Sequence, residues 1–502
     1  MVKRTLALLV ASLVAGALYA DHRERRAPPS ATGALAYEVR DGDTHALIPC
    51  KLTLVGVDGT PPPAFTRNDI GRQEGDAVVA YDRVMSLRGV GVVPVPVGTY
   101  DVYVSRGPEW DLHVERGVRI SPAGAELRAS LRHVVDTAGW ISGDFHVHAA
   151  ASPDSHVPMQ DRIYEFVSDG VEYIVSTDHN VVSDYGPIID ELGARALINS
   201  ATGDELTTNG WGHFGAFPLP RELGRAGGGA VLVHGRAAVD FFADVRRSAP
   251  GAILDVHHPR IDGEVGYFNV SAFDARADVA ARKGFSFDFD ALEVLNGYQD
   301  AERRSVDRVI DDWFSLLNHG HLVTATGNSD THHLDYNIGG YPRNYVRVGG
   351  DDPGRVAPEE LATAIRAHRA FFTTGPFVRV SSGRAEIGDL VAARGGAPLQ
   401  IEVQAAPWIS VSRVTLYVNG NEAKRWAVAP SEEVVRFRQR YDVTATHDTY
   451  VVVRVDGDRP LAPVVGDTRR FDVRPLALTN PIFLDVDGNG VFDRTYPHGR
   501  HR

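Results

Sequence analysis

Several apolar, strand-like segments of this chain end in a histidine that stands beside an acidic residue, and this pattern restricts the fold. Tyr173–Thr177 runs directly into Asp178 and His179, and Ile253–Val256 runs into two histidines. In α/β proteins, polar residues at the carboxyl ends of buried strands lie together and form the site. Five segments share this pattern: Gly143–His148, Ser176–Asn180, Gly203–Leu206, Leu254–Arg260 and Thr326–His333. The chain is therefore predicted to be an α/β protein with one site built from five strand ends.

Helical segments lie between these strands. Met159–Asp169 and Ser305–Asn318 carry apolar residues at helical spacing, and the strands around them are apolar throughout. Buried parallel strands joined by crossover helices are the simplest arrangement that explains this alternation of apolar strands and helical segments. We therefore expect residues 139–380 to form a β/α barrel.

Two β-rich regions flank the predicted barrel. Residues 33–135 contain short β-branched runs separated by turn residues, as in Lys51–Val55 and Tyr100–Val104, and residues 381–495 return to the same texture. A length of 502 residues also exceeds what one hydrophobic core usually supports. Each flanking region is predicted to be a β-sandwich, and the N-terminal one is expected to be an accessory domain without chemistry.

The amino terminus has the pattern of a signal peptide. A basic pair, Lys3 and Arg4, precedes an apolar run from Leu6 to Tyr19, and Ala15-Gly16-Ala17 within this run has the spacing of a cleavage site. The run is shorter than the roughly 20 residues that span a bilayer. Residues 1–20 are therefore predicted to be removed on export to the periplasm or the exterior, with an uncleaved anchor as the alternative.

Composition restricts the classes of binding partner and the kinds of metal ligand that this chain can use. A formal net charge of −13 would repel nucleic acid, so a small-molecule substrate is expected, with no nucleic acid and no stable membrane span after signal cleavage. Twenty histidines stand against a single cysteine, Cys50. Metal sites in such a chain must use nitrogen and oxygen ligands.

Spacing within the motifs indicates which side chains share a face. His146 and His148 are two residues apart on a strand, so both imidazoles can reach one metal ion. Asp330 and His332 have the same spacing. His257 and His258 should point in different directions by strand alternation, and His258 is the favoured ligand.

The motifs resemble, in type and order, those of the polymerase and histidinol phosphatase (PHP) superfamily, and most closely its CehA/McbA-type metallohydrolase branch. They are His146-x-His148, Thr177-Asp178-His179-Asn180, Gly203-Asp204-Glu205, His258-Pro259-Arg260 and Asn328-Ser329-Asp330-Thr331-His332. The resemblance implies a distorted (β/α)7 barrel over residues 139–380. It also implies two or three divalent metal ions, which would be zinc, manganese or iron.

The same resemblance implies the ligands of each metal. His146, His148, Glu205 and Asp330 would surround one ion, Asp154, His179 and His332 a second, and Glu205, His213 and His258 a third. Glu205 would then be a bridge. The chain departs from the family at Asp154, where many relatives have histidine, and His156 two residues later is the alternative ligand.

This ligand set suits hydrolysis, because paired divalent metals can hold a bridging hydroxide as the nucleophile. Arg260 is expected to stabilise a phosphate or an oxyanion, with a salt bridge as its alternative role, and Asp330 and His332 are the other expected catalytic residues. Asp178 and His333 are expected to orient imidazoles. The leading prediction is a phosphoesterase acting on a small phosphoester. A carbamate or carboxylic ester hydrolase and a non-catalytic metal-containing binding protein are the alternatives.

One further motif lies near the carboxyl terminus. Asp485, Asp487, Asn489 and Asp493 match positions of a calcium loop, but Tyr496 stands where a bidentate glutamate is expected. The segment therefore predicts either a calcium site or a plain β-turn, and the turn is favoured.

Overall fold

The computed structural model describes residues 31–263, 265–297, 303–335, 337–466 and 472–493. The predicted signal peptide, residues 1–20, lies outside the described residues, so export stays a prediction. None of the described helices combines the length and the apolar character that a membrane crossing requires.

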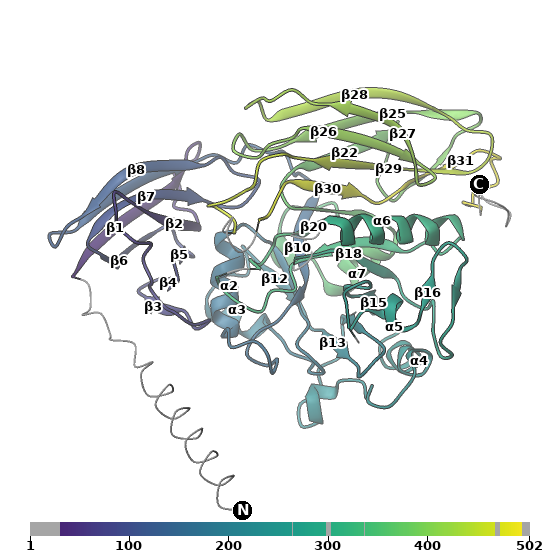
Figure 1. The fold of residues 1–502 in the computed structure, drawn as a ribbon, viewed down its shortest axis with the longest axis horizontal. Coiled ribbons are helices and arrows are strands. Elements are labelled where there is room, and N and C mark those ends of the chain that lie inside the picture. Colours follow the sequence, from purple (N-terminus) through teal and green to yellow (C-terminus); the bar gives the residue numbers. More distant parts are fainter. Residues whose placement is uncertain (1–30, 264, 298–302, 336, 467–471, 494–502) are drawn as a thin grey trace, which may run out of the picture.

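The N-terminal region consists of two packed sheets (Figure 1). One has the strand order β6-β1-β9 and the other the order β3-β4-β5-β2-β7-β8. Their bounds are β1 (Thr32–Asp41), β2 (Cys50–Val57), β3 (Arg72–Glu74), β4 (Ala77–Ala80), β5 (Arg83–Ser86), β6 (Val90–Pro96), β7 (Gly98–Ser105), β8 (His113–Ile120) and β9 (Ala125–Leu131). Alternation explains the packing, because Leu35, Tyr37 and Val39 of β1 all face the core between the sheets.

The prediction of a (β/α)7 barrel is wrong. Ten strands of this region, β10–β15 and β18–β21, divide between two sheets, of eleven and five strands, instead of forming one seven-stranded ring. The larger sheet has the path β12-β11-β10-β20-β21-β30-β29-β26-β27, and the smaller has the order β13-β14-β15-β18-β19. Their central strands are β10 (Trp140–Val147), β11 (Tyr173–Ser176), β12 (Asn199–Ala201), β13 (Asp204–Thr207), β14 (His213–Phe217), β15 (Ile253–Val256), β18 (Ala291–Asn296), β19 (Thr324–Asn328), β20 (Arg343–Arg347) and β21 (Ala370–Thr373).

The error arises from strand pairing, which apolar sequence alone does not specify. β13, β14 and β15 pair antiparallel, with Glu205 opposite Gly215. β10 also pairs antiparallel with β20, with Ser142 opposite Tyr345. Among the described strands of this region, parallel ladders join only β10, β11 and β12 and β15, β18 and β19. Antiparallel neighbours need no crossover helix, so the described part of the region holds fewer helices than the barrel would require.

The described α-helices of the central region include both that the sequence predicts. α2 (Met159–Ser168) and α6 (Arg303–Asn318) occupy the expected positions, and Val309 and Trp313 of α6 are fully buried. The others are α3 (Gly186–Glu191), α4 (Ala238–Ser248), α5 (Tyr267–Val270) and α7 (Pro358–Arg366). Short 3-10 turns (Ala226–Gly229, Pro353–Arg355) and a small hairpin, β16 (Phe273–Asp274) and β17 (Val279–Ala280), complete this part.

The C-terminal strands continue the larger sheet. β30 pairs with β21 of the central region, so hydrogen bonding runs without a break across residue 380. A four-stranded sheet, β23-β22-β25-β28, packs against this half of the larger sheet, and apolar residues of both sheets form one core (Figure 1). The bounds are β22 (Phe377–Ser382), β23 (Ala385–Glu386), β24 (Leu390–Ala392), β25 (Gly396–Gln404), β26 (Arg413–Val418), β27 (Asn421–Ala427), β28 (Val435–Thr444), β29 (Thr449–Asp456), β30 (Leu476–Thr479) and β31 (Ile482–Asp485).

A buried ion pair joins the N-terminal sheets to the central region. The Nζ atom of Lys51 on β2 lies 2.6 Å from Oδ2 of Asp169, which follows α2, and both side chains are inaccessible to solvent. Burial lowers the pKa of Lys51, and the charge of Asp169 opposes that shift. Taking both charges out of water is costly, so the pair stabilises the contact only while both partners are present.

We expect Lys51→Met to lower the free energy of unfolding by about 3–5 kcal/mol, because it leaves Asp169 buried without its partner. The double variant Lys51→Met/Asp169→Leu should recover most of this loss. Urea unfolding followed by tryptophan fluorescence measures both. Arg116→Met is the matched control, since Arg116 is an exposed residue of the same sandwich that pairs with Asp101. Equal urea midpoints for Lys51→Met and Arg116→Met would show that the buried pair contributes nothing.

Candidate metal centre

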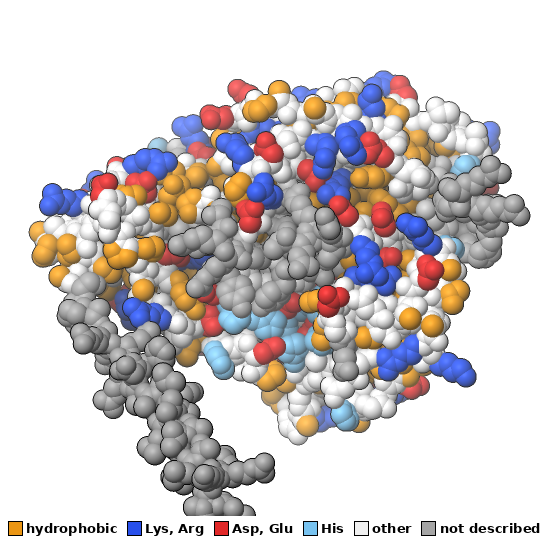
Figure 2. All heavy atoms as spheres, in the orientation of Figure 1, with side chains coloured by type: hydrophobic (Ala, Val, Ile, Leu, Met, Phe, Trp, Pro, Cys, Tyr) orange, Lys and Arg blue, Asp and Glu red, His pale blue; other side chains and the backbone are white. Residues whose placement is uncertain are grey.

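The site lies where the two central sheets meet. Strand ends of the larger sheet supply His146, His148 and His179, while β13 of the smaller sheet carries Glu205 and the turn after β19 carries Asp330. Single parallel bridges join the sheets at this point, one between Val147 and Thr331 and one between His179 and Glu205. The structure thus brings all five predicted strand ends to one place, although the strands do not form a barrel. Figure 2 shows histidine side chains gathered on this face of the molecule.

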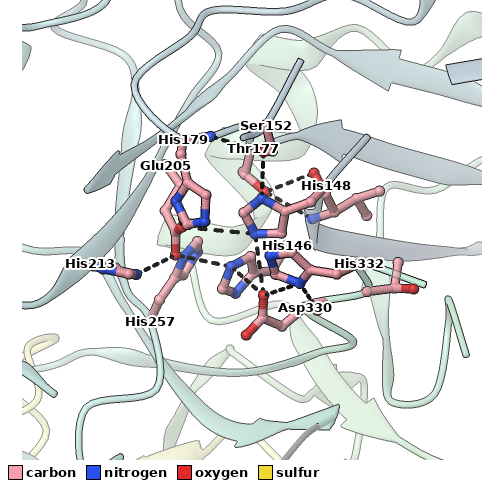
Figure 3. A network of polar contacts seen from close by, with 12 residues as sticks. His146, His148, Ser152, Thr177, His179, Glu205, His213, His257, Asp330 and His332 are labelled. Atoms are coloured by element: carbon pink, nitrogen blue, oxygen red, sulfur yellow. Dashed lines mark hydrogen bonds and ion pairs between the residues drawn. The ribbon is translucent and has the colours of Figure 1, made fainter. Parts of the chain in front are cut away.

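Glu205 is the centre of the cluster (Figure 3). Its carboxylate is completely buried, and six imidazoles approach it within 4 Å. The nitrogen-to-oxygen distances are 3.0 Å for His146, 3.8 Å for His148, 2.6 Å for His179, 3.4 Å for His213, 2.8 Å for His257 and 3.6 Å for His258. The predicted bridging position of Glu205 is consistent with this geometry.

Asp330 is a second carboxylate in contact with the same imidazoles. Its Oδ1 lies 3.1 Å from Nε2 of His146 and 3.2 Å from Nε2 of His148. The ring of His332 stacks on that of His148 at a centroid distance of 3.9 Å. Asp330 has a φ of 54°, a left-handed conformation that turns the chain just after β19.

Asp154 closes the cluster on its solvent side. Its Oδ2 lies 3.0 Å from Nε2 of His179 and 3.4 Å from Nε2 of His332, while half of its side chain is exposed. His156, the alternative ligand, is exposed to solvent. The geometry therefore favours Asp154 at this position.

Sequence reasoning missed His257 as a member of the cluster. Strand alternation separates neighbouring side chains only within a strand, and β15 ends at Val256. The left-handed φ of 27° at His258 turns the chain, so both imidazoles reach Glu205. Gly215 makes room for the ring, because a Cβ there would lie 2.4 Å from Nε2 of His257. The two consecutive histidines at the end of the strand were the sequence feature that could have indicated a second ligand here.

Further polar residues hold the imidazoles in place. Glu293 on β18 has an Oε1 atom 2.9 Å from Nδ1 of His146. Asn296 donates to both Glu293 and Asp330. Asp178 accepts a hydrogen bond from Ser152, which contacts Nδ1 of His148 at 2.9 Å. Asp178 thus contacts His148 through a hydroxyl group.

Arg260 does not face the cluster. Its Nε atom lies 2.6 Å from Oδ2 of Asp312, and its Nη2 atom donates to the carbonyl oxygen of Phe273. The guanidinium also lies over the ring of Phe268. These contacts correspond to the salt-bridge alternative for Arg260, so the structure does not bring this predicted catalytic residue to the site.

The residues present fit divalent metal ions. The described residues contain groups of three or four ligand atoms within 4.8 Å of one another: His148 with Asp154, His179 and His332; His146 with Glu205 and His257; His146 with His258 and Asp330; and His179 with Glu205 and His213. The Nε2 atoms of His146 and His148 are buried, and although carboxylate oxygens lie 3.0–3.2 Å away, none of these contacts has the geometry of a hydrogen bond. Buried polar atoms rarely lack partners, and imidazole nitrogens that converge with carboxylate oxygens are typical of metal ligands.

Charge interactions within the cluster shift the proton affinities strongly. Burial alone would lower the pKa of His179, but the charges of Glu205 and Asp154 outweigh it and raise the pKa to about 10. Burial would raise the pKa of Glu205, yet the charges of the surrounding histidines hold it well below its usual range. The metal-free cluster therefore retains protons on histidine at neutral pH.

A pocket opens onto the cluster. It has a volume of about 340 Å³, and its lining includes the metal-ligand candidates together with Ile261, Val265 and His333. None of the described lining residues is lysine or arginine. A small molecule can therefore approach the cluster along a wall that is partly apolar.

The candidate calcium loop makes internal contacts. Asp485 accepts hydrogen bonds from the backbone N–H groups of Gly488 and Gly490, and the side-chain amide of Asn489 donates to Asp493. These are the contacts of a hydrogen-bonded turn, which the sequence favoured, and calcium binding at this loop stays a prediction.

We expect His148→Ala and Asp330→Ala to lose bound metal while keeping the fold, because each removes a ligand from a cluster that β-sheet pairing already holds together. Metal content after dialysis, together with circular dichroism, measures the two effects. His113→Ala, at a partly buried histidine of β8 outside the cluster, is the control and should keep the metal content of the unsubstituted protein. Full metal content in either cluster variant would contradict the ligand assignment.

Metal uptake should release protons. Because the pKa of His179 is raised to about 10, this imidazole is protonated at pH 7–8 and must lose its proton to bind a metal. Affinity should therefore rise with pH up to about 10. Calorimetric zinc titrations at one pH, in two buffers with different ionisation enthalpies, measure the protons released. Identical heats in both buffers would contradict this expectation, and Asp330→Ala provides the background heat.

No protein-family model matches the chain, and no curated protein resembles it. Among solved structures, an engineered protein is 13% identical, with 64% of this chain and 51% of that one covered and a TM-score of 0.17. The Parabacteroides merdae β-glucuronidase is 10% identical, with 88% and 61% covered and a TM-score of 0.17. This chain thus spans about half to three fifths of the length of these structures. Likenesses this low support no conclusion about fold or function.

Proposed function

We propose that this protein is a metal-dependent hydrolase that acts on a small, uncharged ester or carbamate. The observation that carries the proposal is the buried Glu205 carboxylate with its six imidazoles at the base of an open pocket. Divalent metals held by these residues would activate water and polarise the bond to be broken. A purely structural metal site is usually closed, whereas here the half-exposed Asp154 leaves the cluster accessible.

The residues of the chain have separate roles in this proposal. Glu205 and Asp330 would hold the metals from the buried side, while Glu293 keeps the ring of His146 in one orientation. His332, at the pocket wall, contacts Asp154 and would lie beside the site of reaction. Ile261 and Val265 would exclude water around an apolar part of the substrate.

The pocket favours a carbonyl substrate over the phosphoester that the sequence placed first. A phosphate group would benefit from a guanidinium or ammonium group, but Arg260 is engaged with Asp312. The described pocket lining offers no other such group. An uncharged ester or carbamate needs none, because its charge develops only at the oxygen of the reacting carbonyl.

We expect the zinc- or manganese-loaded protein to hydrolyse 4-nitrophenyl acetate or a 4-nitrophenyl carbamate faster than 4-nitrophenyl phosphate. Glu205→Gln should reduce this rate by at least about 100-fold, since it removes a charge shared by several ligands. Release of 4-nitrophenolate measures the rate, and Glu115→Gln, on the exposed face of β8, is the control. Preferential turnover of the phosphate would support the phosphoesterase alternative, and no turnover at all would refute the hydrolase.

A further inference from the structure

Two of the candidate ligands lie on a segment without regular secondary structure. Asp330 and His332 follow β19, and residues 332–335 contain neither helix nor strand. A segment of this kind has no ladder of backbone hydrogen bonds to hold it, so its position depends on contacts made by other parts of the chain. The contacts of residues 330–335 therefore decide how precisely these two ligands are placed.

One set of contacts comes from the central region. The guanidinium of Arg162 on α2 is fully buried and donates to the carbonyl oxygens of His148, Thr331 and His333 at 2.9–3.1 Å. The hydroxyl of Ser155 donates to the carbonyl oxygen of His332 at 3.0 Å. One side of the segment is thus fastened to the strand end that bears His148.

The other set comes from the N-terminal sandwich. Oδ2 of Asp69, in the connection between β2 and β3, lies 2.8 Å from Nδ1 of His333, and Oδ1 accepts from the backbone N–H of Leu334 at 3.2 Å. Arg83 on β5 donates to the carbonyl oxygens of Leu334 and Asp335 at 2.5 and 3.2 Å. Arg83 is 5% exposed, so these bonds are made largely out of water.

These contacts also reach the pocket. The ring of His333 lines the pocket beside His332, and its Nδ1 atom is engaged by Asp69. An imidazole that is bonded through one nitrogen to a carboxylate is held in one orientation. The hydroxyl of Tyr81 donates to Asp69 at 3.0 Å and holds the carboxylate in turn.

We propose that the N-terminal sandwich is a structural part of the metal centre, and not an accessory domain. Asp69 and Arg83 are positioning residues: they fix the segment that bears Asp330 and His332, and Asp69 seats His333 on the pocket wall. The inference rests on the proposed function for the presence of metals at this cluster. It goes beyond that proposal because it assigns a role to residues some 250 positions away in the sequence.

The test is the zinc affinity of the full-length chain, measured by competition with a chromophoric chelator. We expect Asp69→Ala and Arg83→Gln to weaken zinc binding by about 10-fold to 100-fold, the range for residues that orient metal ligands. The conservative variant Asp69→Asn keeps an acceptor oxygen and should recover part of the affinity. Asp76→Ala, an exposed aspartate of the same sandwich, is the matched control and should bind zinc as the unsubstituted protein does.

A readout separate from stability completes the test. The urea unfolding midpoints of the metal-free variants should stay close to that of the metal-free unsubstituted protein even though their zinc affinity falls. The reason is that the contacts act on a segment outside the sheets. Zinc affinity of Asp69→Ala and Arg83→Gln equal to that of Asp76→Ala would overturn the inference. If Asp69→Ala does not fold, Asp69→Asn carries the same comparison. Failure of the hydrolase proposal would be seen separately, as tight zinc binding by the unsubstituted protein without turnover of any ester.

Discussion

The contact on which the rest of the site depends is that between the buried carboxylate of Glu205 and the imidazoles around it. A carboxylate fully removed from water is stable only if cations or strong donors replace the lost hydration. Six histidines from the ends of four strands provide them, and the charges of His213, His146 and His179 lower the pKa of Glu205 despite its burial. The same requirement brings the strand ends of two sheets together, because the histidines of each sheet reach Glu205 only where the sheets meet.

The composition of the site could be predicted from sequence because its signals are local. The two-residue spacing of His146 and His148, and the acid and histidine after Thr177, depend only on where a strand ends. The overall fold could not be predicted in this way. An apolar strand such as β14 has the same sequence pattern whether its neighbours run parallel or antiparallel. Its pairing is decided by contacts that are distant in sequence. The family resemblance led to the same wrong prediction, since it implied a barrel and the pairing of β13, β14 and β15 does not form one.

Long-range contacts also explain which individual residues were misjudged. Arg260 follows a histidine-bearing strand and by position alone belongs to the site, but Asp312 on α6 draws its guanidinium away. Asp69 has no local feature that distinguishes it from other loop aspartates. It acquires a role only because the N-terminal sheets lie against α2 and the segment after β19, a placement that the buried pair of Lys51 and Asp169 helps to maintain.

The two sides of the cluster differ in a way that bears on its chemistry. On the buried side, Glu205, Glu293 and the ring of His146 have no contact with solvent, and hydrogen bonds fix their orientation. On the open side, Asp154 is half-exposed and binds His179 and His332 directly. A metal held from the buried side keeps a fixed geometry, while ligands on the open side can yield a coordination position to an incoming molecule. This asymmetry suits a catalytic centre better than a structural metal site, and under the proposed function the reacting bond would lie in the pocket lined by Asp154, Ile261 and Val265.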